Sequence, residues 1–447
     1  MNITILGAGK SGIAAALLAH RKGNTVFLSE FQSMERHQHS VERLETASIP
    51  YEFGGHSERV FLHTELIITS PGIPPHAPVI QEAEQRGIPI ISELEYASTF
   101  IHNPIIAVTG TNGKTTTTTL IAFMLEYAGK KSITAGNIGT PLSELVDTID
   151  PATIIVAETS SYQLDRLQTF HPTIAIILNI TPDHLAYHGT FDNYSRAKFA
   201  ITKNQTAKDL LILNADDTAV AAYPHNSAAQ VQYFSMSPMQ QGAYKKDRAL
   251  CIKNTIQHKE EIIMVFDEMR LPGDHNAQNA LAAALAVRAF EVSNEDIRDS
   301  LMKFAGVEHR LEFVRTFRSV DFINDSKATN VNAAWYALSS YQRPLVWIAG
   351  GRGDNNHYAS LDEVVKNNVH CIICIGEEKD ALFNHYSAMV RCIRADSLEQ
   401  AVHYAVDNAN LNDIVLFSPA CKSFDMFLNY EHRGEVFKQV VLALDEN

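Results

Sequence analysis

The chain has 447 residues, of which 45% are hydrophobic and 20% charged, a globular composition that excludes a disordered protein and is long enough for about three domains. Its net charge of −14 argues against nucleic acid as a partner, since nucleic-acid binding draws on clustered lysine and arginine. No apolar run approaches the roughly 20 residues that span a membrane and no signal peptide opens the chain, so we expect a cytoplasmic protein without a membrane partner.

The five cysteines are too scattered for a disulfide framework, which fits a reducing compartment. Cys371 and Cys374 have the spacing of a metal-binding pair. They lie within residues 369–376, however, which are predicted to form a buried parallel strand, and the sequence contains no second pair. We therefore expect no metal site at these cysteines.

The first block alternates short β-branched runs with helical stretches, which predicts a parallel α/β sheet. Strands are expected at 2–6, 25–28, 66–69 and 89–91, and helices at 11–22 and 76–86. A glycine-rich turn at 7–12 closes the first strand, and Glu30 follows the second. This arrangement predicts a nucleotide-binding domain, although a plain strand-to-helix turn explains the glycines too.

The middle block opens with a phosphate-binding loop. An apolar run from Ile105 leads into Gly110-Thr-Asn-Gly-Lys-Thr-Thr116, and a helical run follows. Backbone N–H groups of this loop can converge on phosphate oxygens, Lys114 adds a positive charge, and the Thr115 hydroxyl suits Mg²⁺. We therefore expect ATP to bind here.

Further strands of the middle block are predicted at 154–156, 174–178 and 210–213, and each ends in polar residues. Ligands of open α/β sheets gather at the carboxyl ends of the strands, so Glu158 and His184 are expected to face the same crevice as Lys114. Glu158 suits Mg²⁺, and His184 suits a metal or a phosphate. Lys198 follows on an amphipathic helix, where spacing alone predicts a surface lysine.

The last block is predicted to form another Rossmann-like sheet, with strands at 345–348 and 414–417. Asp325-Ser-Lys-Ala-Thr-Asn330 follows an apolar run and places a carboxylate, an ammonium and a hydroxyl at a strand end. Together with Arg310 this segment could contact a phosphate. A capped turn is the alternative, because Asp325 and Ser326 are both good N-cap residues.

Motifs in all three blocks resemble those of the ATP-dependent Mur ligase family. They occur in the family's order, at 110–116, 158–161, 179–184, 275–280, 309–310 and 325–330. Two segments, 325–330 and 418–427, are similar to the D-glutamate-adding members specifically. The resemblance implies a Rossmann-like UDP-substrate-binding domain at 1–101, a central P-loop ATPase-type α/β domain at 102–306, and a Rossmann-like amino-acid-binding domain at 307–447.

The resemblance also implies the reaction. Such a ligase adds D-glutamate to UDP-N-acetylmuramoyl-L-alanine through an acyl phosphate, in the synthesis of peptidoglycan precursors. ATP and two Mg²⁺ ions would be required, and the chain would act as a monomer. In the family the lysine at the position of Lys198 is carbamylated, which turns an ammonium into an anionic ligand for the second Mg²⁺.

Site residues are carried over from the family's motifs. The catalytic and metal-binding groups implied are Lys114, Thr115, Glu158, His184 and Lys198. ATP would contact Thr111, Asn112, Gly113, Lys114, Thr115, Thr116, Thr117, Asn279, Arg310 and Asp325. The UDP-linked substrate would contact Ser11, Glu30, Gly72 and Asn137, and D-glutamate would contact Lys327, Thr329, Arg352, Ser423 and Tyr430.

Two residues depart from the family pattern. Arg352 takes the place of a lysine that often holds a D-glutamate carboxylate, and Tyr430 stands where phenylalanine is frequent. Three other functions stay open at this point: another Mur-type or a folylpolyglutamate-type amino-acid ligase, a dinucleotide-binding oxidoreductase suggested by Gly7 and Gly9, and a noncatalytic protein that binds ATP without releasing phosphate.

Overall fold

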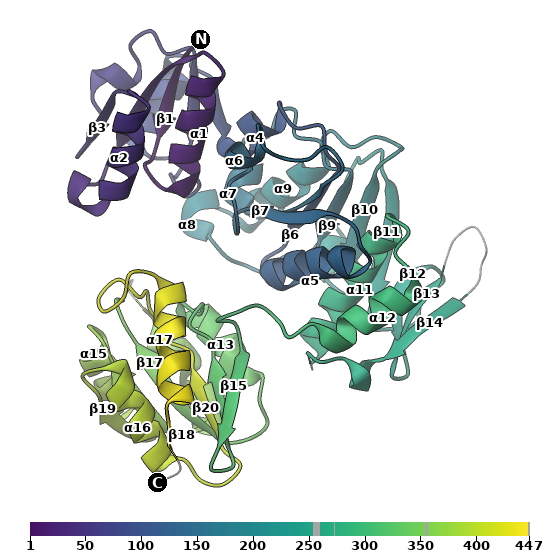
Figure 1. The fold of residues 1–447 in the computed structure, drawn as a ribbon, viewed down its shortest axis with the longest axis vertical. Helices are drawn as coiled ribbons and strands as arrows, with labels where there is room; N and C mark the ends of the chain where they lie inside the picture. The colour runs from purple at the N-terminus through teal and green to yellow at the C-terminus, as the bar shows by residue number, and fades with distance from the viewer. Residues whose placement is uncertain (254–259, 272, 354–355, 446–447) are drawn as a thin grey trace. The chain divides into compact units, whose positions relative to one another are not determined.

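A computed structural model describes residues 1–253, 260–271, 273–353 and 356–445. The chain divides into two compact units, Met1–Phe304 and Ala305–Asn447. Figure 1 shows three α/β sheets, two in the first unit and one in the second, which confirms the predicted fold class. Among the described residues, no helix is both long enough and apolar enough to cross a membrane.

The N-terminal sheet of the first unit is parallel, with strand order β3-β2-β1-β4-β5. The predicted strands are confirmed, and a three-residue strand, too short for a sequence pattern, adds one edge. The strands are β1 (Asn2–Leu6), β2 (Thr25–Glu30), β3 (Tyr51–Phe53), β4 (Leu66–Thr69) and β5 (Ile90–Ser92). The helices are α1 (Lys10–Arg21), α2 (Gln38–Thr46), α3 (Pro78–Gln85) and α4 (Glu93–Ser98).

The central sheet has the order β14-β13-β12-β11-β10-β9-β6-β8-β7. Its strands run parallel as far as β12, and the pairs β12/β13 and β13/β14 are antiparallel. The parallel strands are β6 (Ile105–Thr109), β7 (Ser132–Gly136), β8 (Ile154–Glu158), β9 (Ile174–Ile177), β10 (Leu210–Asn214) and β11 (Gln230–Ser235). The edge beyond them comprises β12 (Gly242–Lys246), β13 (Ala249–Lys253) and β14 (Glu260–Val265).

Helices cover both faces of the central sheet (Figure 1). One face carries α5 (Lys114–Tyr127), α11 (Asp274–Arg288) and α12 (Asn294–Lys303). The buried alanines of α11, such as Ala280 and Ala284, are small enough for α11 to pack closely beside α5. The unit's remaining helices are α6 (Leu142–Leu145), α7 (Ser161–Leu164), α8 (Leu185–His188), α9 (Phe191–Phe199) and α10 (Thr218–Ala221).

The sheet of the second unit has the order β15-β16-β20-β17-β18-β19, parallel except for β15. Its strands are β15 (Glu312–Phe317), β16 (Val320–Asn324), β17 (Leu345–Gly350), β18 (Val369–Ile375), β19 (Arg391–Arg394) and β20 (Ile414–Phe417). One face packs on α13 (Val331–Ser339), α14 (Asp362–Asn368) and α15 (Lys379–Tyr386). The other packs on α16 (Leu398–Asn408) and α17 (Tyr430–Leu442).

The predicted buried strand around the cysteine pair is β18. Cys371 packs in the core on one face of the sheet and Cys374 in the core on the other. Side chains three residues apart on a strand point in opposite directions, so this pair cannot bind one metal ion together.

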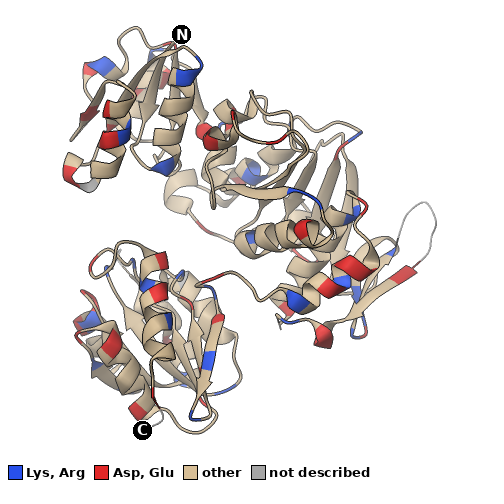
Figure 2. Cartoon of the chain, in the orientation of Figure 1, with Lys and Arg blue, Asp and Glu red and all other residues tan. Residues whose placement is uncertain are grey.

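Figure 2 shows most of the inner strands free of charged residues, with acidic and basic residues on helices, loops and sheet edges.

Candidate active site

The phosphate-binding loop connects β6, an inner strand of the central sheet, with the start of α5. Gly113 adopts a φ of +83°, a conformation that glycine reaches without strain, and a Cβ there would lie 2.5 Å from Asn279 Oδ1. Asn179, beyond the end of β9, holds the loop in place. Its Oδ1 accepts from the Asn112 N–H at 2.8 Å, and its backbone carbonyl accepts from the Thr111 N–H at 2.9 Å.

Two lysines converge on this loop. Lys114 Nζ donates to the carbonyl oxygens of Gly110 at 2.9 Å and Thr111 at 2.8 Å. Lys198 Nζ donates to the same Gly110 carbonyl at 2.8 Å and is only 1% exposed. The prediction that Lys198 is a surface lysine is therefore wrong, because α9 turns this side chain into the interior beneath the loop. Burial first, and then the charge of Lys114, lower the pKa of the Lys198 amine well below its ordinary value.

Glu158 ends β8 beside the loop and is 2% exposed. Its Oε2 accepts from the Thr115 hydroxyl at 2.7 Å, and its Oε1 accepts from Asn137 Nδ2 at 2.8 Å. The predicted convergence of Glu158 and Thr115 is thus present. Asn137, which is expected to contact the muramoyl substrate, thus lies next to this carboxylate.

His184 lies just before α8 with a left-handed backbone, at φ +52°. Its ring packs against Tyr162 at a centroid distance of 4.9 Å, and its Nε2 lies 3.4 Å from Asp183 Oδ2. Burial lowers the pKa of His184, and the positive charges of Lys114 and Lys198 lower it further, against the opposing effect of Asp183. The neutral imidazole therefore prevails at pH 7 and keeps a lone pair for a ligand.

Asn279 connects α11 with the first turn of α5. Its Oδ1 accepts from the Thr117 hydroxyl at 3.1 Å, and both side chains are buried. Asn279 therefore lies at the start of the helix that follows the phosphate-binding loop.

The chemistry of these donors fits Mg²⁺. No cluster of three or more His, Cys, Asp or Glu side chains suited to a metal occurs in the part of the chain that the structure describes. Mg²⁺ does not need such a cage, because it takes one or two protein oxygens and completes its shell with water and phosphate. The adjacent Glu158 carboxylate and Thr115 hydroxyl provide such oxygens at the mouth of the loop.

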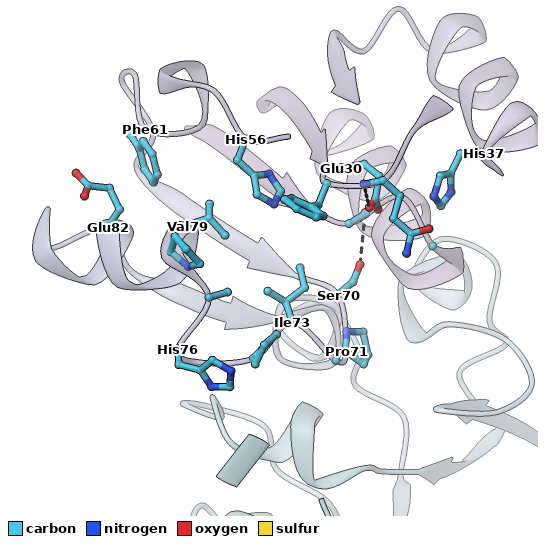
Figure 3. Close-up of a pocket in the computed structure, with 18 of the residues that line it drawn as sticks. Glu30, His37, His56, Phe61, Ser70, Pro71, Ile73, His76, Val79 and Glu82 are labelled. Atoms are coloured by element: carbon cyan, nitrogen blue, oxygen red, sulfur yellow. Dashed lines mark hydrogen bonds between the residues drawn. The ribbon is translucent and has the colours of Figure 1, made fainter. Parts of the chain in front are cut away.

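A separate pocket of about 1050 Å³ lies at the ends of β1, β2 and β4 of the N-terminal sheet, where Gly7, Glu30 and Ser70 line it (Figure 3). Glu30 and Gly72, both expected to contact the substrate, line it, whereas Ser11 is not among its described lining residues. Glu30 also supports the glycine-rich turn, because its Oε2 accepts from the Ala8 N–H at 2.7 Å and its Oε1 from the Gln32 N–H at 2.8 Å.

Asp325 follows β16 in the second unit and is 5% exposed. Its Oδ2 accepts from the Ser418 hydroxyl at 2.8 Å. Burial raises its pKa to about 6, although Arg310 favours the charged form. The turn of the alternative interpretation is present, since the Ala328 N–H donates to the Asp325 carbonyl at 2.9 Å, but neither Asp325 nor Ser326 is the N-cap of α13. The N-cap is Asn330, whose side chain accepts from the Ala333 N–H at 2.8 Å.

The predicted D-glutamate residues fall into two groups in the described part of the second unit. Lys327 lies over the ring of Tyr430, with Nζ 5.7 Å from the centroid, and its N–H donates to the carbonyl of His309 at 2.9 Å. Arg352 instead exchanges backbone hydrogen bonds with Lys422, the neighbour of Ser423, and pairs with Glu377 at 2.8 Å. Thr329 is half-buried, two residues from Lys327.

Sequence reasoning missed Arg433, a fully buried cation behind this site. Its guanidinium donates to Ser326 Oγ at 3.0 Å, to the Ser326 carbonyl at 2.7 Å and to the Cys421 carbonyl at 3.0 Å. It therefore joins the segment of Asp325 to that of Ser418. The sequence carries no signal for this role, because Arg433 lies within an ordinary helix.

Comparisons with known proteins agree with this arrangement. The chain matches the Mur ligase MurD-like N-terminal domain at residues 1–92, the Mur ligase middle domain at 108–287, and the Mur ligase glutamate ligase domain at 309–421. A solved UDP-N-acetylmuramate-alanine ligase MurC of Thermotoga maritima shares the fold, with a TM-score of 0.60 at 19% identity over 99% of both chains.

A FolC structure of E. coli, in complex with DHPP and ADP, has a TM-score of 0.56 at 18% identity and covers 78% of this chain and 92% of its own. At such identities the likeness concerns the fold. The chain belongs to the Mur ligase family, because it has full-length relatives at much higher identity. These are the UDP-N-acetylmuramoylalanine–D-glutamate ligases of Salinibacter ruber, 40% identical over 99% of this chain and 97% of the relative, and of Chlorobaculum parvum, 43% identical over 98% and 97%.

Proposed function

We propose that the chain is an ATP-dependent ligase that joins D-glutamate to UDP-N-acetylmuramoyl-L-alanine, in the cytoplasmic synthesis of peptidoglycan precursors. The names of its full-length relatives support this reaction. The observation that carries it is the convergence of Lys114 and Lys198 on the Gly110 carbonyl, next to the Thr115–Glu158 pair. Such a cluster is suited to a reaction that gathers negative charge.

The chemistry proceeds in two steps. The γ-phosphoryl group is transferred from ATP to the L-alanyl carboxylate, which gives an acyl phosphate and releases ADP as the leaving group. The D-glutamate amine then attacks the acyl carbon, loses a proton and expels inorganic phosphate, so that an amide remains. Phosphoryl transfer depends mainly on positioning and charge stabilisation, and Lys114 is the cation best placed for it.

In this proposal ATP lies along the loop and the start of α5, and Asn279 contacts the adenine. Arg310 and Asp325 of the second unit contact the phosphates and the ribose. The loop residues involved are Thr111, Asn112, Gly113, Lys114, Thr115, Thr116 and Thr117. The left-handed Gly113 supports this assignment, because it lets the backbone turn its N–H groups toward one point.

Mg²⁺ would be held by Thr115 and Glu158, with His184 and a carbamylated Lys198 as ligands of a second ion. The bound ions would neutralise charge on the transferring phosphoryl group. Carbamylation requires a neutral amine that attacks CO₂ and loses a proton, and the 1% exposure of Lys198 disfavours its ammonium form.

The remaining assignments follow the same family pattern. The N-terminal pocket would bind the uridine diphosphate through Ser11, Glu30 and Gly72, and Asn137 would contact the muramoyl group. D-glutamate would contact Lys327, Thr329, Arg352, Ser423 and Tyr430. We also propose domain boundaries at 101/102 and 306/307, and a monomeric enzyme.

The test is phosphate release from ATP and Mg²⁺ in the presence of UDP-N-acetylmuramoyl-L-alanine. Parallel reactions contain D-glutamate, L-glutamate, L-lysine or no amino acid. We expect release with D-glutamate alone. Release with another amine would retain a ligase but overturn the acceptor, and no release with any of them would leave a nucleotide-binding protein without this activity.

A further inference from the structure

Three side chains form a hydrogen-bonded series at the wall of the N-terminal pocket. Ser29, fully buried on β2, donates from Oγ to Glu52 Oε1 at 2.7 Å, and the same Oγ lies 2.7 Å from His56 Nδ1. The His56 ring lines the pocket (Figure 3), and its centroid lies 6.0 Å from that of Phe31. Glu52 and Ser29 are not lining residues in the described chain, so they reach the pocket only through His56.

The series determines which nitrogen of His56 carries the proton. Burial would raise the pKa of Glu52, but hydrogen bonds from Ser57 and Ser29 outweigh it and hold the pKa below its ordinary value, so Glu52 is an ionised acceptor. Ser29 therefore donates its single hydroxyl proton to Glu52. Its oxygen can only accept from His56, which places the imidazole proton on Nδ1.

The other nitrogen of His56 is then an acceptor. Burial lowers the pKa of His56 despite the nearby Glu30 and Glu52, so the ring is neutral at pH 7 and has one N–H. Within the described residues, no hydrogen bond involves Nε2. The pocket wall thus presents a lone pair next to Phe31, a residue that is 72% exposed and whose ring offers an apolar surface to a planar base.

We infer that His56 reads the base of the bound nucleotide, with its Nε2 accepting the N3–H of uracil, and that Ser29 and Glu52 are positioning residues that maintain this tautomer. The inference rests on the proposed function, in which this pocket holds a uridine diphosphate. Cytosine carries a lone pair at N3 in place of the N–H, so it would face the lone pair of Nε2. The pocket should therefore select uridine over cytidine nucleotides.

Calorimetric titration of the full chain with UDP and with CDP tests this selection. We expect the unaltered chain to bind UDP at least about tenfold more tightly than CDP, the worth of one well-formed hydrogen bond. His56→Phe keeps an aromatic ring but removes the acceptor, so it should weaken UDP about tenfold and CDP hardly at all. His76→Phe, the same change at another pocket-lining histidine, should leave the ratio of the two affinities unaltered.

The positioning residues are tested through the tautomer. In ¹⁵N spectra of the full chain, His56 should be protonated at Nδ1. Ser29→Ala should abolish that preference and lower the ratio of the UDP affinity to the CDP affinity. Ser29→Thr keeps the hydroxyl and should restore both, which a merely structural role of Ser29 does not predict. This pair also decides the matter if His56→Phe fails to fold.

Several results would overturn the inference. Protonation at Nε2 in the unaltered chain would do so, as would an equal loss of UDP and CDP affinity in His56→Phe, which indicates a ribose or phosphate contact. If the chain releases phosphate with D-glutamate but His56→Phe has the same ratio of UDP to CDP affinity as the unaltered chain, the role of His56 is refuted and the proposed function is retained. If the chain neither releases phosphate nor binds UDP, the proposed function falls with it.

Discussion

Lys114 reaches back to its own loop, where its ammonium bonds the carbonyls of Gly110 and Thr111. When a phosphate binds in the loop, Lys114 would donate to its charged oxygens in place of the two carbonyls. Charged oxygens form stronger hydrogen bonds with an ammonium. We expect Lys114→Ala to lower phosphate release by at least about a hundredfold, because it removes the cation aimed at the developing charge.

The fold of Lys114→Ala should be intact, which its melting temperature checks. Lys208→Ala is the matched control, because Lys208 is an exposed lysine of the same unit and should retain full turnover. Turnover in Lys114→Ala comparable to that of the control would refute the role of this lysine.

Lys198 supports a second prediction at the scale of one side chain. With ¹³C-bicarbonate present, a carbamate carbon resonance should appear in the chain and disappear in Lys198→Arg, whose guanidinium does not react with CO₂. Lys203→Arg is the control, because Lys203 is exposed and five residues away. A resonance that persists in Lys198→Arg would place the carbamate elsewhere.

Asp325 should make stability depend on pH. Its folded pKa, raised by burial to about 6, lies above the roughly 3.9 of an unfolded aspartate. Such a group stabilises the fold fully below pH 4, and this contribution is lost as the pH rises through 6. Relative to Asp325→Asn, the unaltered chain should gain about 1 to 1.5 kcal/mol between pH 8 and pH 5, measured by urea unfolding.

Asp321 is the control, because its pKa is shifted in the opposite direction to that of Asp325. Burial would raise its pKa, but hydrogen bonds from Thr316 and Arg343 lower it below the ordinary value. The stability it contributes is present at neutral pH and is lost in acid, so Asp321→Asn should be least harmful at low pH. The Asp325 prediction fails if Asp325→Asn shows the same trend as Asp321→Asn.

At the scale of elements, the phosphate-binding loop depends on the adjacent strand β9. Asn179 makes two side-chain hydrogen bonds to the backbone of Asn112, at 2.8 and 3.1 Å. Asn179→Ala loses both, so the loop should be less ordered before ATP binds. Because each bond is worth about 1 kcal/mol, we expect the KM for ATP to rise about tenfold or somewhat more, with a smaller change in kcat.

The control for Asn179 is Asn204→Ala, which also removes two side-chain hydrogen bonds to backbone carbonyls, those of Gln168 and Phe170. It should leave the KM for ATP unchanged, because neither carbonyl belongs to the loop. An equal rise in both variants would assign the effect to general destabilisation instead.

The sequence predicted well those elements whose pattern is local. The buried parallel strands are apolar runs bounded by polar residues, so β6, β8 and β9 and the polar groups after them could be placed. The antiparallel edge of β12 to β14 was not predicted, because β12 has only Ala243 and Tyr244 before two lysines, and β14 begins with two glutamates before its apolar run at 262–265. Each of these strands pairs with the next strand along the chain, β12 with β13 and β13 with β14, so context within the sheet decides whether they form.

The same distinction applies to the site. Glu158 and Thr115 were expected to converge because the carboxyl ends of parallel strands meet at one edge. Lys198 was misjudged from spacing, because its burial depends on how α9 packs beneath Gly110. Arg433 and the Glu52–Ser29–His56 series were missed for a related reason, since each joins segments that are separate in the sequence.

At the scale of the whole chain, each apolar cluster of buried residues lies within one unit, either Met1–Phe304 or Ala305–Asn447. Each unit therefore has its own core, and a fragment ending at Phe304 should fold alone. The N-terminal pocket belongs entirely to that fragment, whereas Arg310, Asp325 and Lys327 do not.

We therefore expect fragment 1–304 to bind UDP with an affinity within about twofold of the full chain, by calorimetry, since no lining side chain is lost. It should release no phosphate with UDP-N-acetylmuramoyl-L-alanine and D-glutamate, since the groups proposed for the amino acid are absent. Fragment 305–447 should bind no UDP. Turnover by fragment 1–304 alone would place the D-glutamate site in the first unit, and a folded fragment without UDP affinity would show that the pocket requires the second.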